Sequence, residues 1–177
     1  MTDERAGLRF RRPTAGAGLR FRRPTEADHA RVIAVVDEWW GGRRMRALLP
    51  RLWFQHFTGT SWIAEDGAGR LGGFLVAFIS PDAPDTGYVH MIATDPNRRR
   101  SGIGAALYQR AFTDLAAQGA QRVVAITWPG NRISVAFHLR QGFRVLTSAA
   151  TVPIYGTPAT PDYDGEGEDR VVFVRDL

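Results

Sequence analysis

The chain of 177 residues contains no cysteine. It also contains no lysine, since all 23 of its lysine-or-arginine positions are arginine. Without cysteine it can form no disulfide, thiolate metal site or acyl-cysteine intermediate. Without lysine it lacks the residue that a Walker phosphate loop or a pyridoxal-phosphate Schiff base requires. We also expect no metal centre, since there is no HExxH pair and the only histidines are His29, His56, His90 and His138.

Long apolar runs are also missing. The longest, such as residues 74–79, are too short to cross a bilayer, and no apolar stretch follows the arginine-rich start. We therefore expect a cytoplasmic protein with no membrane partner. The formal net charge of +5 favours an anionic ligand, but no nucleic-acid recognition motif accompanies it, so nucleic acid is not the expected partner.

The start of the chain contains an exact repeat. The nine residues AGLRFRRPT occupy positions 6–14 and again positions 17–25, where they lead into a helix signal with Thr25 as the expected N-cap. We interpret residues 19–23 as the first strand and residues 1–16 as a disordered extension of a single domain, 17–177. In the alternative interpretation, the first copy pairs with a sheet edge.

Hydrophobic periodicity and turn residues then predict alternating helices and strands. The expected helices cover residues 26–40, 45–57 with a break near Pro50, 102–118 and 131–141. The expected strands cover residues 19–23, 61–65, 71–80, 86–94, 122–127, 143–152 and 170–175. This order predicts a mixed α/β sheet in one domain of about average size.

The segment TDPNRRRSGIGAAL, residues 94–107, leads from a strand through an arginine-rich turn into a helix. The first amides of a helix have no internal acceptor and carry partial positive charge, which suits an anion. Gly102 and Gly104 would let a phosphate approach the backbone closely. The segment does not match the dinucleotide fingerprint, which needs glycine or alanine where Leu107 stands. Alone, it is equally consistent with a turn bearing solvated arginines.

A second segment, NRISVAFHLRQGF at residues 131–143, follows about 30 residues later. Together the two segments resemble the GNAT acetyltransferase family. Arg99-x-x-Gly102-x-Gly104 is similar to the family's diphosphate loop. The second segment is similar to its Asn-x-x-Ala-x-x-Phe-Tyr-x-x-x-Gly-Phe helix, through Asn131, Ser134, Phe137, Gly142 and Phe143. The resemblance covers residues 19–143. It implies a mostly antiparallel central sheet with helices on both faces and strands splayed at an acyl-CoA site.

The resemblance further implies acetyl-CoA as co-substrate. The diphosphate would lie on the backbone of Arg99, Arg100, Ser101, Gly102, Ile103 and Gly104. The pantetheine arm would lie in a gap beside residues 122–127, along Ile92, Ala93 and Thr94. Asn131 and Ser134 would line the far side of the gap, on the same helical face as His138.

The implied reaction is direct attack of an amine on the thioester in a ternary complex. His138 stands where the family usually has a tyrosine that protonates the leaving thiolate, so either His138 or water would supply that proton. For the base we choose His90, expected on the same side of the sheet as Ile92 because it lies two residues before it. The alternative is a histidine packed and hydrogen-bonded against a helix.

The family builds its acceptor site from the first helices and last strands, which would place Asp37, Trp39 and Trp40 opposite Tyr155. Alternatively the tryptophans belong to the core, and Arg43, Arg44 and Arg46 select a carboxylate-bearing acceptor. The sequence thus predicts an N-acetyltransferase acting on a small-molecule amine or a peptide amino group. The rival interpretation is a non-catalytic acyl-CoA sensor. Homodimers are common in the family, so a homodimer is also implied.

Overall fold

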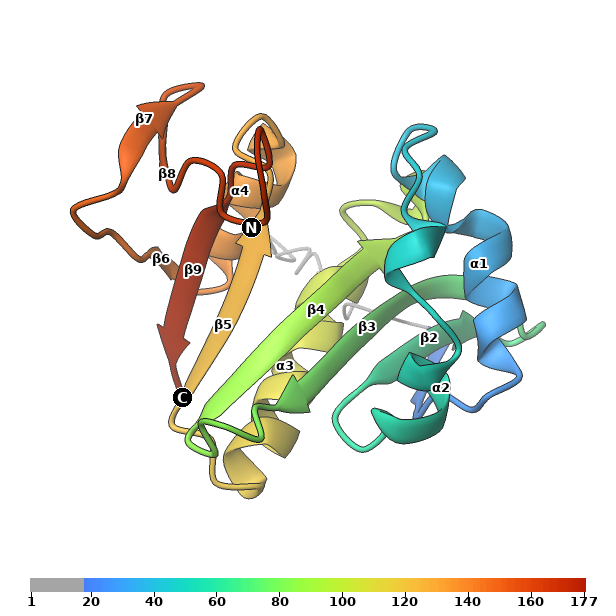
Figure 1. The fold of residues 1–177 in the computed structure, drawn as a ribbon. Helices are drawn as coiled ribbons and strands as arrows, with labels where there is room; N and C mark the ends of the chain where they lie inside the picture. Colours follow the sequence, from blue (N-terminus) through green and yellow to red (C-terminus); the bar gives the residue numbers. More distant parts are fainter. Residues whose placement is uncertain (1–17) are drawn as a thin grey trace, which may run out of the picture.

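A computed structural model describes residues 18–177 of the chain, so the predicted extension at residues 1–16 lies outside the described residues. Seven strands form one sheet, and its β4–β5 pair is parallel while the other neighbouring pairs are antiparallel (Figure 1). The strands, in spatial order, are β1 (Leu19–Arg22), β2 (Trp62–Asp66), β3 (Leu71–Ile79), β4 (Thr86–Thr94), β5 (Arg122–Thr127), β9 (Val171–Asp176) and β6 (Arg144–Val145). This confirms the predicted fold class.

Helices cover both faces of the sheet and divide the core in two. One face carries α1 (Asp28–Trp39), the 3₁₀ turn η1 (Arg46–Leu48) and α2 (Leu52–His56), over a cluster centred on Phe74. The other carries α3 (Ile103–Ala117) and α4 (Arg132–Arg140), over a cluster centred on Tyr108. The short turn η2 (Pro96–Arg98) precedes α3. None of the helices in residues 18–177 has the length and apolar character needed to cross a membrane.

The start of α1 differs from the prediction that Thr25 caps it. Ala27 occupies the cap position and makes no side-chain hydrogen bond there. Instead, the buried carboxylate of Asp28 reaches back and accepts hydrogen bonds from the Thr25 amide and hydroxyl, at 2.8 and 3.0 Å. Asp28 also pairs with Arg22, which ties the helix start to β1.

The C-terminal part departs furthest from the prediction of one strand across residues 143–152. Only β6 lies there, because its two residues are the ones that pair with β9. A separate hairpin follows, formed by β7 (Val152–Ile154) and β8 (Thr157–Ala159). Its two turn residues, Tyr155 and Gly156, both have positive φ, as a type I′ turn requires.

Candidate active site

The β4 and β5 strands pair over only part of their length. Their parallel ladder runs from Thr86 opposite Arg122 to Val89 opposite Ala125 and ends there, although β4 continues to Thr94. The two ribbons diverge beyond this point (Figure 1). The predicted gap is therefore present. Within residues 18–177, the remaining part of β4, which includes Ile92, Ala93 and Thr94, has no partner strand on its β5 side.

A β-bulge marks the point where the strands part. Val76 of β3 lies opposite Met91 and Ala77 lies opposite Val89, which leaves His90 as an extra residue in β4. The bulge reverses the alternation of side chains, so Met91 packs in the α1-side cluster while Val89 packs in the α3-side cluster. The expectation that His90 and Ile92 face the same side was therefore wrong. Ile92 packs toward α3, whereas His90 contacts η1 and α2.

The half-buried ring of His90 is held from two sides. Its Nε2 lies 2.7 Å from the Leu48 carbonyl oxygen, and its ring stacks on Trp53 with centroids 4.2 Å apart and planes 16° apart. A carbonyl only accepts, so Nε2 carries the proton and Nδ1 has the free lone pair when the ring is neutral. Burial lowers the pKa of His90, against the opposing effect of the Leu48 hydrogen bond. The geometry therefore favours a neutral imidazole with a basic Nδ1.

The predicted anion loop enters α3 through two unusual backbone conformations. Gly102, the residue that caps α3, has φ +84°, and Arg100 has φ +65°. The amides of the first turn that follows have no acceptor within the helix. Arg99 and Arg100 are exposed beside them. Arg98 differs, because its guanidinium pairs with the carboxylate of Asp66. This pair holds the pKa of the Asp66 carboxyl well below its usual range.

The remaining motif residues lie where α3 meets α4. A Cβ on Gly104 would lie 2.8 Å from the Phe137 ring, so Gly104 permits close helix packing in addition to its predicted role toward phosphate. Asn131 caps α4, since its Oδ1 accepts a hydrogen bond from the Ser134 amide at 3.1 Å. Ser134 is half-buried, on the same helix as His138 and one turn before it.

His138 is buried, and the protein engages both of its ring nitrogens. Nδ1 lies 2.8 Å from the Ser134 carbonyl oxygen, to which it donates, so Nε2 accepts from the Tyr108 hydroxyl at 2.8 Å. The ring also stacks on Phe173, with centroids 4.7 Å apart. Burial lowers the pKa of His138 and raises that of Tyr108 well above its usual range. The predicted proton transfer from His138 would thus require this network to open.

The predicted acceptor residues occupy both sides of the gap. The Trp39 and Trp40 rings pack on Phe74, with centroids 6.3 and 6.4 Å from its own. Asp37 accepts from the amides of Met45 and Arg46 and pairs with the Arg46 guanidinium. Across the gap, Tyr155 is 60% exposed at the hairpin turn.

Sequence reasoning missed three contacts near this site. Trp53 stacks on His90, and Arg43 lies over Trp128, with its guanidinium carbon 4.7 Å from the ring centroid. Tyr88 packs on Phe78 with ring centroids 5.5 Å apart, and burial raises its pKa to about 12. The first two pairs join residues far apart in sequence, and no local spacing signals them.

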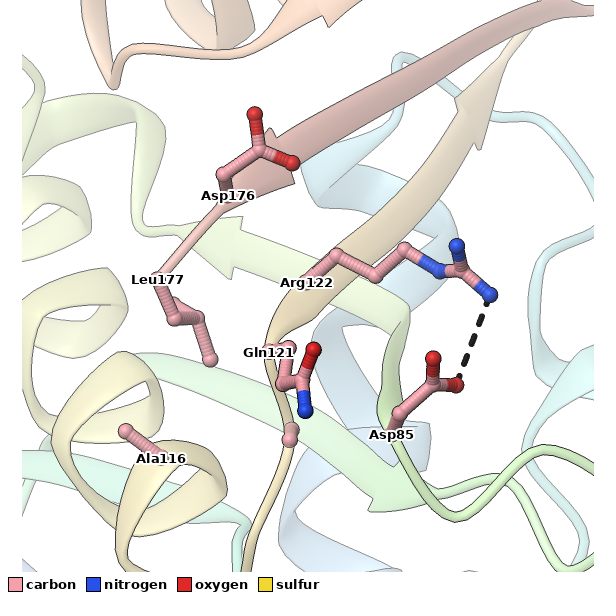
Figure 2. A pocket seen from close by; sticks show the side chains of 7 residues that line it. Asp85, Ala116, Gln121, Arg122, Asp176 and Leu177 are labelled. Carbon is pink, nitrogen blue, oxygen red and sulfur yellow. Dashed lines mark hydrogen bonds and ion pairs between the residues drawn. The ribbon is translucent and has the colours of Figure 1, made fainter.

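Figure 2 shows a different pocket, at the opposite end of β5. Its lining includes the ion pair between Asp85 and Arg122, whose nitrogen and oxygen lie 3.4 Å apart, together with Gln121 and Leu177. It is far from His90 along β4, beside the paired start of the strand. Within residues 18–177, no three His, Asp or Glu side chains gather in a way that could hold a metal ion.

A mixed sheet that opens between two parallel strands, beside a helix start suited to an anion, is the arrangement that the resemblance in the sequence implied. The sequence model described as the acetyltransferase (GNAT) family matches residues 22–143, more than half of the chain. The chain belongs to this family.

Several relatives share one named activity. The L-2,4-diaminobutyric acid acetyltransferase of Nocardia farcinica is 31% identical over 111 residues, which cover 63% of this chain and 57% of that relative. The Streptomyces coelicolor enzyme of the same name is 29% identical over 127 residues, covering 69% and 71%. A Paenibacillus lautus diaminobutyrate acetyltransferase, solved with L-2,4-diaminobutyric acid and coenzyme A, is 25% identical. It superposes with a TM-score of 0.67 over 89% of this chain and 94% of that one.

Proposed function

We propose that this protein transfers the acetyl group of acetyl-CoA to an amino group of a small diamino acid, with L-2,4-diaminobutyrate as the first candidate. The observation that carries the proposal is the edge of β4 that has no partner strand within residues 18–177, close in the chain to the start of α3, whose first amides have no acceptor within the helix. The names of the relatives supply the acceptor class, which neither the fold nor the motifs identify.

In this proposal the loop and the unpaired strand edge hold the co-substrate. The amides from Gly102 to Gly104, with Arg99 and Arg100, bind the diphosphate through backbone hydrogen bonds and positive charge. The edge formed by Ile92, Ala93 and Thr94 offers backbone groups to the pantetheine amides, as a neighbouring strand would. Asn131 and Ser134 face this arm from the start of α4.

His90 serves as the base in this proposal. An alkyl ammonium must lose a proton before it can attack a thioester, and its ordinary pKa leaves it mostly charged near neutral pH. His90 stays neutral there because burial lowers its pKa, and its free Nδ1 can accept that proton directly or through one water. It acts from the α1–α2 side of the sheet, opposite the side on which Ile92 packs.

The leaving thiolate needs a proton from the other direction. Because Tyr108 and the Ser134 carbonyl already engage His138, we assign this step to solvent and a structural role to His138. Asp37, Trp39, Trp40 and Tyr155 stay the proposed acceptor-side residues. No feature of residues 18–177 favours the non-catalytic sensor.

The test is thiol release from acetyl-CoA by the purified protein, with L-2,4-diaminobutyrate, a tripeptide with a free N-terminus, or no acceptor. We expect saturable release with the diamino acid above the rate without acceptor, and a product heavier by one acetyl group in mass spectrometry. Release with the tripeptide but not with the diamino acid would mean that the acceptor is a peptide amino group instead of a small diamino acid. Acetyl-CoA binding without release for any acceptor would overturn the enzymatic proposal in favour of the sensor.

A further inference from the structure

A cation–aromatic pair joins the two sides of the gap. Arg43 belongs to the loop between α1 and η1, and Trp128 directly follows β5. These two segments stand on opposite sides of the diverging strands in Figure 1. The Arg43 guanidinium carbon nevertheless lies 4.7 Å from the centroid of the Trp128 ring, and that ring meets Tyr155 edge-on at 5.5 Å.

The loop that carries Arg43 is fixed by its neighbours. Asp37 accepts hydrogen bonds from the amides of Met45 and Arg46, at 2.8 and 2.9 Å, and from the Arg46 side chain at 2.6 Å. Arg46 is thereby neutralised. Arg43 differs, since within residues 18–177 no carboxylate lies within ion-pair distance of its guanidinium. The backbone of this loop is thus held in place, while the exposed Arg43 side chain has no carboxylate partner in the part of the chain that the structure describes.

The aromatic contact leaves the hydrogen-bonding capacity of Arg43 available. A ring attracts a guanidinium to its face, whereas the N–H donors of the guanidinium lie in its own plane and match a carboxylate in a two-pronged geometry. An arginine supported in this way is preorganised for a carboxylate, because fewer rotamers are lost on binding.

We propose that Arg43, supported by Trp128, binds the carboxylate of the acceptor and so makes this enzyme specific for amino acids over simple diamines. The proposal rests on the proposed function and identifies its specificity-determining residue. The acceptor then spans from Arg43 at its carboxylate to His90 at its reacting amine. The phosphates of the co-substrate are the competing ligand for Arg43, but the proposed function already assigns them to the first amides of α3 and to Arg99.

The experiment compares two acceptors that differ by one carboxylate, L-2,4-diaminobutyrate and 1,3-diaminopropane, using wild type, Arg43→Gln and Arg144→Gln. Arg144 is the control, an exposed arginine on the edge strand β6. We expect Arg43→Gln to lower kcat/KM for the diamino acid by about 10- to 100-fold, the range for a lost charge-assisted contact. For diaminopropane we expect a change of less than about threefold, and Arg144→Gln should resemble wild type with both.

The outcomes separate the two proposals. If wild type acetylates neither compound, the acceptor class of the proposed function fails. If wild type acetylates the diamino acid but Arg43→Gln lowers kcat/KM equally for both acceptors, or for neither, the carboxylate assignment is overturned. A rise in the KM for acetyl-CoA without discrimination between acceptors would instead assign Arg43 to the co-substrate. Thermal unfolding of each variant, followed by circular dichroism, checks that both variants are folded as wild type is.

Discussion

At the scale of single residues, the proposed chemistry depends on which nitrogen of His90 is free. The Leu48 carbonyl fixes the proton on Nε2, and Trp53 fixes the plane of the ring. Burial of the ring lowers its pKa, although the Leu48 hydrogen bond acts in the opposite direction. One small environment therefore sets the tautomer, the orientation and the protonation state of the base.

Replacing His90 tests this arrangement through its pH dependence. Wild type should lose kcat/KM as the pH falls through the lowered pKa of His90, below its ordinary value of 6.5, because the base becomes protonated there. His90→Gln should reduce kcat by about 10²- to 10⁴-fold and remove this acid limb. Steady-state rates across a range of pH give both quantities.

His56→Gln is the control for that experiment. His56 is exposed at the end of α2, so the variant should keep both the rate and the acid limb of wild type. An unchanged acid limb in His90→Gln would remove His90 from the reaction and return it to the packed histidine of the alternative interpretation.

The role of His138 is tested by His138→Phe. The Tyr108 hydroxyl would lose its buried acceptor, so we expect the free energy of unfolding to fall by about 1–3 kcal/mol. We expect kcat to change by less than about fivefold, since solvent protonates the thiolate. Urea unfolding and steady-state kinetics measure the two effects. A much larger loss of kcat with unchanged acetyl-CoA affinity would restore His138 as the acid.

At the scale of elements, the gap is produced by a bulge and a glycine turn. The extra residue His90 redirects β4 away from β5, and Gly102 turns the chain so that the first amides of α3 face the same opening. The N-terminus of α3 and the strand edge left unpaired within residues 18–177 thus follow one another in the chain, separated by η2.

The glycine turn can be tested with a matched pair of alanine variants. Gly102→Ala and Gly119→Ala both place a Cβ on a residue with positive φ, at +84° and +96°, at the two ends of α3. Each should lower stability by about 1 kcal/mol. Only Gly102→Ala should weaken acetyl-CoA binding, by about tenfold or more, because it misaligns the amides. Calorimetric titration with acetyl-CoA measures the affinity of each variant. Equal affinities in both variants would contradict the assigned diphosphate site.

Local sequence signals predicted where the helices and strands lie, but not the register in which neighbouring strands pair. The range expected for β4 is the observed one, and α3 begins one residue after its expected start, because alternation and glycine punctuation are local properties. The bulge at His90 was not predictable, since it exists only relative to the register of β3. The contacts of Trp53 and Arg43 depend on the path of the α1–α2 connection. The β7–β8 hairpin was missed because Tyr155 is an unusual residue at positive φ.

At the scale of the whole molecule, an ion-pair network ties the N-terminal half together. The buried carboxylates of Glu65 and Asp28 share Arg22 and Arg31, so β1, α1 and β2 meet in one cluster. Arg22, followed by Arg20 and Arg31, lowers the pKa of Glu65 to about 2. A depressed carboxyl pKa stabilises the fold above its ordinary value of 4.5, and this contribution is lost as the pH falls toward 2.

Glu65→Gln therefore should destabilise the protein in a pH-dependent way. Near neutral pH we expect a loss of about 1–3 kcal/mol, since the variant removes the buried carboxylate that pairs with the half-buried Arg22 and Arg31. The difference from wild type should shrink as the pH falls below the ordinary pKa of glutamate. Glu26→Gln, which breaks an exposed pair with Arg51, is the control and should change stability little. Urea titrations at several pH values measure this, and a pH-independent difference would contradict the network's role.

The predicted homodimer stays a prediction, and one chain supplies every residue of the proposed site. The proposed contacts with acetyl-CoA come from β4, from the loop and first turn of α3, and from the start of α4. The proposed acceptor contacts come from α1, the loop after it, the segment after β5 and the β7–β8 hairpin. The whole molecule thus brings two halves of the sheet to one reaction site.

The most direct test of this central claim is a crystal structure of the protein with coenzyme A. We predict the diphosphate on the amides of Gly102 to Gly104, and the pantetheine arm between β4 and β5 beside Ile92 and Thr94. Coenzyme A bound elsewhere, or β4 and β5 paired along their whole length with the arm excluded, would contradict the account.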